Sequence, residues 1–119
     1  MKLEVGMYVR TIMLPELPSQ IRKIIRIDEE SGSIFIDKKV GIVNSFYEKG
    51  ITKASHNIID LIEVGDYVNG LEVVNKSIWN NSPNIEYALH FEDGNVIEND
   101  FIKSIVTKEQ FKQMEYEVK

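Results

Sequence analysis

The residues that could carry acid–base chemistry are few and scattered along the chain. His56 and His90 are its two histidines, and it contains no cysteine. A Ser-His-carboxylate triad requires a serine and an acid around one imidazole, and Ser55 adjoins His56 only in sequence. Two separate histidines without thiolates do not match the ligand spacing of a zinc site. We therefore assign no catalytic residue, metal site or cofactor, and expect a non-enzymatic protein.

Five basic residues make the best case for a phosphate-bearing ligand. Arg22, Lys23 and Arg26 fall on one predicted strand, and Lys38 and Lys39 follow its partner strand. Strict alternation would place Arg22 and Arg26 on one face, where they could meet phosphates beside an aromatic ring. Three acidic residues follow in the next turn, which is also what an ordinary solvated strand face would show.

Charge differs between the two halves of the chain. Residues 1–62 contain nine Lys/Arg and eight Asp/Glu, a net of +1, and residues 63–119 contain five and eleven, a net of −6. An acidic half repels phosphate at long range. Nucleic acid therefore stays an alternative partner, through the first half, and the favoured partner is a protein.

Three apolar residues are the predicted protein-binding positions. Trp79 ends a predicted strand before a polar turn, and Trp is enriched both at binding surfaces and at domain contacts. It could therefore fill a seam between the halves or face a partner. Leu14 and Leu17 lie in a loop that Pro15 and Pro18 bracket, so this loop cannot be a central strand.

An internal repeat predicts the elements that position these residues. The segment Leu-Glu-Val-Gly-Met-Tyr-Val at 3–9 returns 59 residues later as Ile-Glu-Val-Gly-Asp-Tyr-Val at 62–68. Its equivalent positions, which we expect to be structural, are Gly6, Tyr8, Gly65 and Tyr67. Such a repeat predicts two modules, 1–62 and 63–119. Modules of about 60 residues are marginal alone, so we expect them to pack together.

Alternating apolar and polar residues predict short strands and tight turns in both halves. In the first half the expected strands are 5–11, 21–28, 33–37 and, as the last strand, the apolar run 58–62. Between them, 42–47 could be a strand or a short helix, and 51–54 could be a short strand. In the second half they are 66–69, 72–79, 85–91, 95–98 and 102–106. Asn69-Gly70 is a strong hairpin signal.

The end of the chain reads as a helix over 107–118. Thr107 is a good N-cap, and Gln110 completes a capping-box pattern. An apolar stripe follows at Phe111, Met114 and Val118. A helix of this length is marginal in water, so we expect it to dock on a barrel end or on a partner chain.

Two resemblances extend this interpretation. The glycine, tyrosine and valine that open each half, followed by hairpins and a short element before the last strand, resemble SH3-like barrels of the Tudor and KOW kind. Segments 53–70 and 102–111 resemble small proteins encoded by phages and prophages of Gram-positive bacteria. That likeness implies a bacterial host but no particular activity.

The expected fold is therefore mainly β, with two tandem SH3-like small barrels packed together and a short C-terminal α-helix. No apolar run approaches the ~20 residues that cross a bilayer, and the first residues contain no apolar signal core. We expect a cytoplasmic protein without a membrane partner. Self-association through the last helix or an open strand edge is a further alternative.

Overall fold

The computed structural model describes residues 2–13, 17–40, 43–81, 83 and 85–114. Within these residues the fold is mainly β, with two five-stranded antiparallel sheets and one short α-helix near the C-terminus. This confirms the predicted mainly β character and the short C-terminal helix. The chain divides into two compact units, unit 1 at Met1–Leu61 and unit 2 at Ile62–Lys119, and the division falls one residue before the boundary expected from the repeat.

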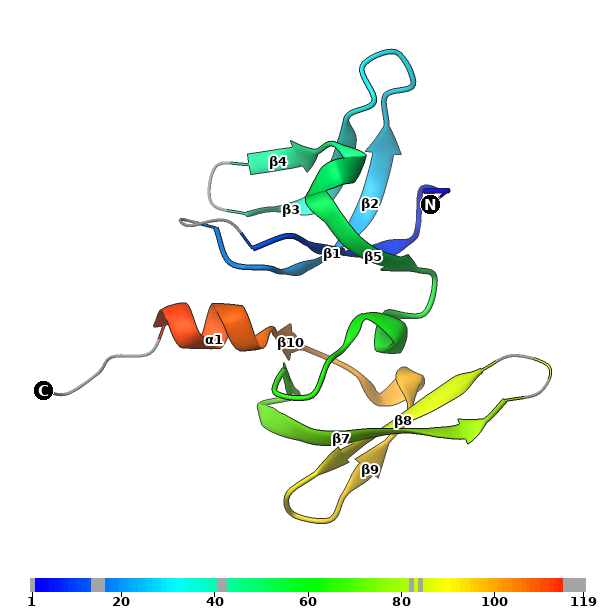
Figure 1. The fold of residues 1–119 in the computed structure, drawn as a ribbon, viewed down its shortest axis with the longest axis vertical. Helices are drawn as coiled ribbons and strands as arrows, with labels where there is room; N and C mark the ends of the chain where they lie inside the picture. The colour runs from blue at the N-terminus through cyan, green and yellow to red at the C-terminus, as the bar shows by residue number, and fades with distance from the viewer. Residues whose placement is uncertain (1, 14–16, 41–42, 82, 84, 115–119) are drawn as a thin grey trace, which may run out of the picture. The chain divides into compact units, whose positions relative to one another are not determined.

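Unit 1 contains one antiparallel sheet in the strand order β4-β3-β2-β1-β5 (Figure 1). Its strands are β1 (Tyr8–Thr11), β2 (Ile21–Ile27), β3 (Ile34–Val40), β4 (Val43–Phe46) and β5 (Ile51–Ser55). Two 3₁₀-helices complete the unit: η1 (Glu48–Gly50) joins β4 to β5, and η2 (Ile58–Leu61) follows β5. The first strand therefore lies inside the sheet, between the second and the fifth.

Unit 2 repeats this topology in shorter elements, in the order β10-β6-β7-β8-β9. Its strands are β6 (Tyr67–Val68), β7 (Leu71–Asn80), β8 (Glu86–Phe91), β9 (Val96–Ile97) and β10 (Ile105–Val106). The 3₁₀-helix η3 (Asn99–Phe101) joins its fourth and fifth strands as η1 does in unit 1, and α1 (Lys108–Met114) follows the fifth. The described strands of neither unit pair into a closed barrel.

The sequence repeat forms the same turn in both units. Gly6 and Gly65 have φ values of 93° and 100°, a left-handed conformation that glycine adopts without a Cβ clash. Three backbone hydrogen bonds surround each glycine at matching positions. In unit 1 they are Gly6 N to Ile24 O (2.9 Å), Met7 N to Glu4 O (3.1 Å) and Ile24 N to Met7 O (2.8 Å). In unit 2 they are Gly65 N to Val73 O (2.9 Å), Asp66 N to Glu63 O (3.0 Å) and Val73 N to Asp66 O (2.8 Å).

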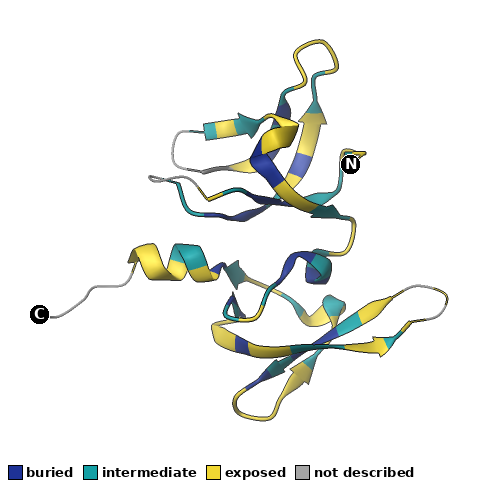
Figure 2. Ribbon diagram, viewed as in Figure 1, coloured by how far each residue is buried: buried dark blue, intermediate teal, exposed yellow. Residues whose placement is uncertain are grey.

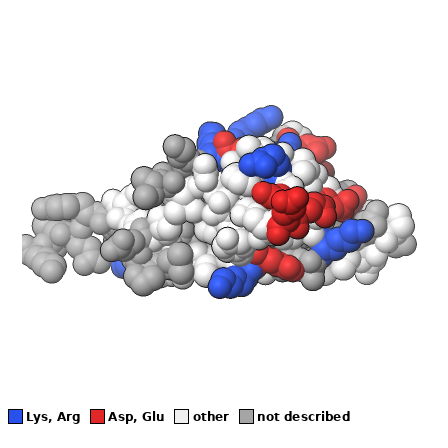
Figure 3. Space-filling model, turned by 90° about the horizontal axis from the view of Figure 1, so that it is seen from above, with Lys and Arg blue, Asp and Glu red and all other residues white. Residues whose placement is uncertain are grey.

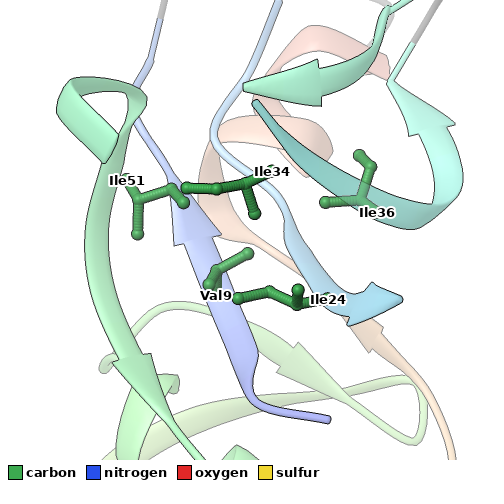
Figure 4. Packing of buried hydrophobic residues seen from close by; sticks show 5 residues of the cluster. All are labelled: Val9, Ile24, Ile34, Ile36 and Ile51. Atoms are coloured by element: carbon green, nitrogen blue, oxygen red, sulfur yellow. The ribbon is translucent and has the colours of Figure 1, made fainter. Parts of the chain in front are cut away.

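Unit 1 has a core of branched aliphatic side chains from four strands (Figure 4). Each member is at most 5% exposed: Val9, Ile24, Ile34, Ile36 and Ile51. Full burial of one such side chain contributes about 1.5–3 kcal/mol, so these residues account for a large share of the stability of a small unit. In unit 2, Val68, Val73 and Leu89 are fully buried and play the corresponding role.

Strand β2 departs from the predicted alternation. The pairing of β2 with β3 shifts register between Ile24 and Arg26, as at a β-bulge. Ile24 is buried in the core, whereas the next two residues, Ile25 and Arg26, are both exposed. A bulge inserts one extra residue into a strand, so residues beyond it exchange faces.

The last strand of unit 1 was assigned wrongly from the sequence, whereas that of unit 2 lies within the expected range 102–106. Residues 58–61 form η2, and the fifth strand of unit 1 is β5, which pairs with β1 through Tyr8 and Ser55. Its counterpart is β10, which pairs with β6 through Tyr67 and Val106. A short apolar run does not by itself distinguish a strand from a helical turn, which explains the error. Strand β3 also continues to Val40, beyond the expected end at 37.

The capping box of α1 is confirmed. Thr107 Oγ1 accepts a hydrogen bond from Gln110 N (3.1 Å), and Gln110 Oε1 accepts one from Thr107 N (3.0 Å). The buried carboxylate of Asp66 adds a second contact, because its Oδ1 accepts from Lys108 N at 2.9 Å. Residues 115–118 of the expected helix lie outside the described residues.

Candidate interaction surfaces

The end of the β7–β8 hairpin carries exposed apolar side chains. Ile78 is 55% exposed, Trp79 53% and Ile85 52%. Ile78 pairs with Tyr87 across the hairpin, and the register shifts between Ile78 and Asn80, so Trp79 stands at an irregular position near the strand end. Figure 2 shows this end of the hairpin as mostly exposed. We call Ile78, Trp79 and Ile85 the hairpin tip.

The same two strands are buried further from the tip. Val73 on β7 and Leu89 on β8 are fully buried, and Val73 pairs with Phe91 across the sheet. Between core and tip, Lys76 Nζ lies 4.4 Å from the centre of the Tyr87 ring and donates to Ile62 O at 3.0 Å. Apolar residues of the hairpin therefore continue past the buried part of β7 and β8 to its exposed end.

The two leucines of the predicted protein-binding set belong to unit 1, whereas Trp79 belongs to unit 2. Leu14 lies outside the described residues. Leu17 is half-buried and packs against the core cluster of unit 1. Much of the apolar surface of Leu17 is therefore used within unit 1.

Comparison of the chain with protein families, curated proteins and solved structures finds no match. Its surfaces must therefore be interpreted from their own geometry. Among the described residues, no helix is long and apolar enough to cross a membrane.

Each histidine has a polar neighbour close by. His90 Nε2 lies 2.7 Å from Ser77 Oγ across β7 and β8. His56 Nε2 lies 3.5 Å from a carboxylate oxygen of Glu4, and both side chains are more than half exposed. Within the described ranges, no cluster of three or more His, Asp or Glu side chains is placed to hold a metal ion.

Ser55 is hydrogen-bonded to a carboxylate and to the backbone. Its hydroxyl donates to Asp60 Oδ2 at 2.5 Å and accepts from Asn57 N at 3.0 Å. These contacts hold the turn that leads into η2, so Ser55 stabilises a local backbone structure.

The basic residues of β2 divide between the two faces of the sheet. Arg22 pairs with the buried Val9 and therefore shares its face, whereas Arg26 pairs with Phe35 on the other. The expectation that Arg22 and Arg26 share a face was thus wrong, because the bulge between them reverses the alternation. Arg22 donates to Ile21 O and to Gln20 Oε1, and burial lowers its pKa while Asp37 partly raises it.

Two other cations lie over aromatic rings. Arg26 Cζ is 3.9 Å from the centre of the Phe35 ring, and Lys23 Nζ is 5.7 Å from that of Tyr8. Lys38 is exposed at the far part of β3, the strand whose backbone also includes Lys39. On the face drawn in Figure 3, acidic side chains gather in a group bordered by basic ones, so charge alone marks no basic patch there.

The equivalent tyrosines of the repeat have different neighbours. Tyr8 pairs with Lys23, and Tyr67 pairs with Glu72, whose Oε1 accepts from the Tyr67 hydroxyl at 3.2 Å. The Tyr67 ring also stacks on Phe111 of α1, with ring centres 4.1 Å apart. The repeat thus keeps the tyrosine and its strand position but exchanges a cationic neighbour for an acidic one.

The sequence singled out Trp79 as a candidate binding residue. It did not reveal that Ile78 and Ile85 are also exposed at the tip, or that Phe35 contacts Arg26. Ile78 and Ile85 belong to apolar runs that resemble core strands in the sequence. The length of β7, which extends past its buried residues, is the feature that could have indicated their exposure. The Phe35–Arg26 contact depends on the bulge in β2, which the sequence alone does not reveal.

Proposed function

We propose that the protein is a non-enzymatic protein-binding module and that the hairpin tip is its contact surface. The observation that carries this proposal is the presence of three large apolar side chains, each more than half exposed, at the end of one hairpin. Isolated exposed apolar residues are ordinary on protein surfaces, whereas a group that includes Trp is typical of binding sites. The tip supplies such a group at the end of two paired strands.

Each unit is proposed to be an SH3-like small barrel, the two arranged in tandem. Support comes from the strand order, in which the first strand lies between the second and fifth, and from the 3₁₀-helix that precedes each fifth strand. The proposed origin is a phage or prophage of a Gram-positive bacterium, which places the partner in the cytoplasm of the host. This part rests on the resemblance of segments 53–70 and 102–111.

The proposal assigns a structural role to the Ser77–His90 pair. Its atoms come from neighbouring strands, and Ser77 pairs with the buried Ala88 in the same sheet. A serine nucleophile also requires donors for the oxyanion and a group that orients the base. A cross-strand hydrogen bond between polar side chains stabilises a sheet without such groups. The variant Ser77→Ala should therefore retain partner binding.

Partner capture by immobilised protein tests the tip. Trp79→Ala, with an unchanged circular dichroism spectrum, should weaken binding of the captured host or phage protein about 30-fold, the effect of losing one hot-spot side chain. The matched control is Phe101→Ala, because Phe101 is 61% exposed in the same unit but lies on η3. Equal affinities of Trp79→Ala and the wild type would reject the tip as the site.

Self-association is the competing occupant of the same surface. A second copy bound through the tip would appear as a dimer in sedimentation velocity, and Trp79→Ala would convert it to a monomer. A wild-type monomer at high concentration would leave the proposal with a different protein as partner.

A further inference from the structure

One face of the sheet in unit 1 combines aromatic rings with cations. Ile34 and Ile36 are buried in the core, so Phe35 between them points to the opposite face. By the same alternation Tyr8, which precedes the buried Val9, lies on that second face. The cross-strand partners of these rings are Lys23 and Arg26. We call Tyr8, Lys23, Arg26 and Phe35 the cation–aromatic face.

The order of the strands gives this face a regular layout. Strand β2, which carries both cations, lies between β1 with Tyr8 and β3 with Phe35. Two strand spacings separate β1 from β3, which corresponds to about 10 Å. A central row of positive charge is therefore flanked by one ring on each side. Lys23 and Arg26 are exposed, and both rings are half-buried.

We propose that the cation–aromatic face binds single-stranded nucleic acid. Bases of a single strand stack on aromatic rings or on Arg guanidinium planes while Lys side chains meet the phosphates, and sheets that carry these groups are a common platform for this contact. Because Arg26 Cζ lies 3.9 Å from the centre of the Phe35 ring, a base at this position would stack on the Arg26–Phe35 pair. A duplex keeps its bases stacked on each other, so it cannot use the rings. This site belongs to unit 1 and is independent of the hairpin tip in unit 2.

Charge supports the choice of unit 1 for such a ligand. Residues 1–62 have a net charge of +1, and residues 63–119 have a net charge of −6. Two acids oppose this charge locally: Asp37, which follows the buried Ile36 and accepts from Lys23 N at 3.0 Å, and Asp28, which interacts electrostatically with Arg26. Backbone hydrogen bonds leave both carboxylates charged, so phosphate must compete with them for the two cations and the advantage of unit 1 is relative to unit 2.

Fluorescence anisotropy with a labelled oligothymidine of about 15 nucleotides tests the proposal on the full chain. The wild type should bind at ~50 mM salt and lose affinity steeply by ~200 mM. The double variant Lys23→Gln/Arg26→Gln should bind about tenfold more weakly and reduce the slope of log K against log salt by about 1.4. Phe35→Leu, which keeps an apolar side chain, should lose about tenfold at unchanged slope.

Controls separate this site from general attraction. Lys103→Gln removes one exposed cation from unit 2 and should leave the affinity unchanged. A duplex of the same length should bind more weakly than the single strand. Absence of binding at ~50 mM salt, where the phosphate contribution is strongest, would overturn the proposal. Equal losses from Lys103→Gln and Arg26→Gln, or full affinity in a folded Phe35→Leu variant, would overturn it as well.

Discussion

Units 1 and 2 use the same opening turn but fill the position after its glycine differently. In unit 1 that residue is Met7, which packs against the apolar core. In unit 2 it is Asp66, a fully buried acid whose carboxylate accepts from Glu63 N (2.8 Å) and Lys108 N (2.9 Å). The backbone of the turn does not depend on either side chain. The side chain after the glycine can therefore pack on the core, as Met7 does, or accept hydrogen bonds from nearby and distant residues, as Asp66 does. In unit 2 it connects the turn to α1.

A second equivalent position places an acid beside a basic side chain in both units. Glu4 lies near His56, and Glu63 lies 2.8 Å from Lys108 Nζ. His56 and Lys108 each follow the fifth strand of their unit closely. The two units therefore keep an acid in the turn and a basic group after the last strand, although the helices that follow differ in type. The variants below test how much of each unit depends on these contacts.

The largest expected effect comes from Asp66→Ala. Removal of the carboxylate leaves the amides of Glu63 and Lys108 without their acceptor, which should lower the stability of unit 2 by about 3 kcal/mol. The matched change Met7→Ala removes half-buried apolar surface and should cost unit 1 about 1 kcal/mol. Native-state hydrogen exchange, read at Val73 N and Ile24 N, distinguishes the units. A cost for Asp66→Ala no larger than that for Met7→Ala would contradict this difference.

The turn glycines should give a smaller and more similar effect. Alanine at Gly6 or Gly65 must adopt a positive φ, which costs about 1–2 kcal/mol. A Cβ at Gly65 would also lie 3.3 Å from Lys108 Cδ, whereas one at Gly6 has open space. Chemical denaturation should therefore show a slightly larger loss for Gly65→Ala. A clearly larger loss at Gly6 would show that the turns are not equivalent.

Removal of the side chains that cap the segments after the fifth strands should have the next largest effect on stability. Thr107→Ala removes the N-cap of α1 and should cost about 1 kcal/mol. Ser55→Ala removes the contacts that hold the turn before η2 and should cost less, because Ser55 is half-buried and the Asn57 amide can bond to water, whereas Thr107 is fully buried. Circular dichroism should show a loss of helical signal for Thr107→Ala alone. Retention of the full signal would mean that Asp66 is sufficient to hold the first turn of α1.

The smallest predicted effects are those of pH, and they differ between the units. The hydrogen bond to Glu63 raises the pKa of Lys108 above 10.5, so its contribution is complete below pH 10.5 and is lost as pH rises through the folded-state pKa. Lys108 is 45% exposed, which limits this contribution to less than about 1 kcal/mol. Lys108→Met should remove the alkaline slope measured by exchange in unit 2.

In unit 1 the pH effect lies in acid. Hydrogen bonds from the amides of Ser31 and Glu30 lower the pKa of Asp28 below 3.8. Its contribution is therefore present above pH 3.8 and is lost as pH falls through the lower folded-state pKa. Asp28→Asn should flatten the acid slope of unit 1 in an unfolding titration. An unchanged acid slope would assign that slope to other carboxyl groups.

Much of this comparison could be predicted from local sequence. The repeat predicted the shared turn, the capping box predicted the start of α1, and Asn69-Gly70 predicted a turn in which both residues have positive φ. These features depend on residues that lie close together in the chain. The identity of the fifth strand, the bulge in β2 and the burial of Asp66 depend on pairings across the fold, such as the 42-residue separation from Asp66 to Lys108.

The candidate surfaces show the same difference between local features, which the sequence predicts, and long-range pairings, which it does not. Trp79 was found because it precedes a polar turn, but its exposed neighbours Ile78 and Ile85 resemble core residues in sequence. Lys23 and Arg26 were identified as cations, but their common face with Tyr8 and Phe35 follows from strand register. The sequence therefore identified which residue types could bind a ligand, and the strand register determined which of them lie on the same face.

The position of each first strand inside its sheet has a consequence for folding during translation. Strand β1 pairs with β5, so the sheet of unit 1 can form once the ribosome has released residue 55. Strand β6 must wait for β10, so unit 2 completes its sheet only after residue 106 has emerged. Because domains fold as units from the N-terminal side during synthesis, a nascent chain would carry a finished first sheet while the second remains open.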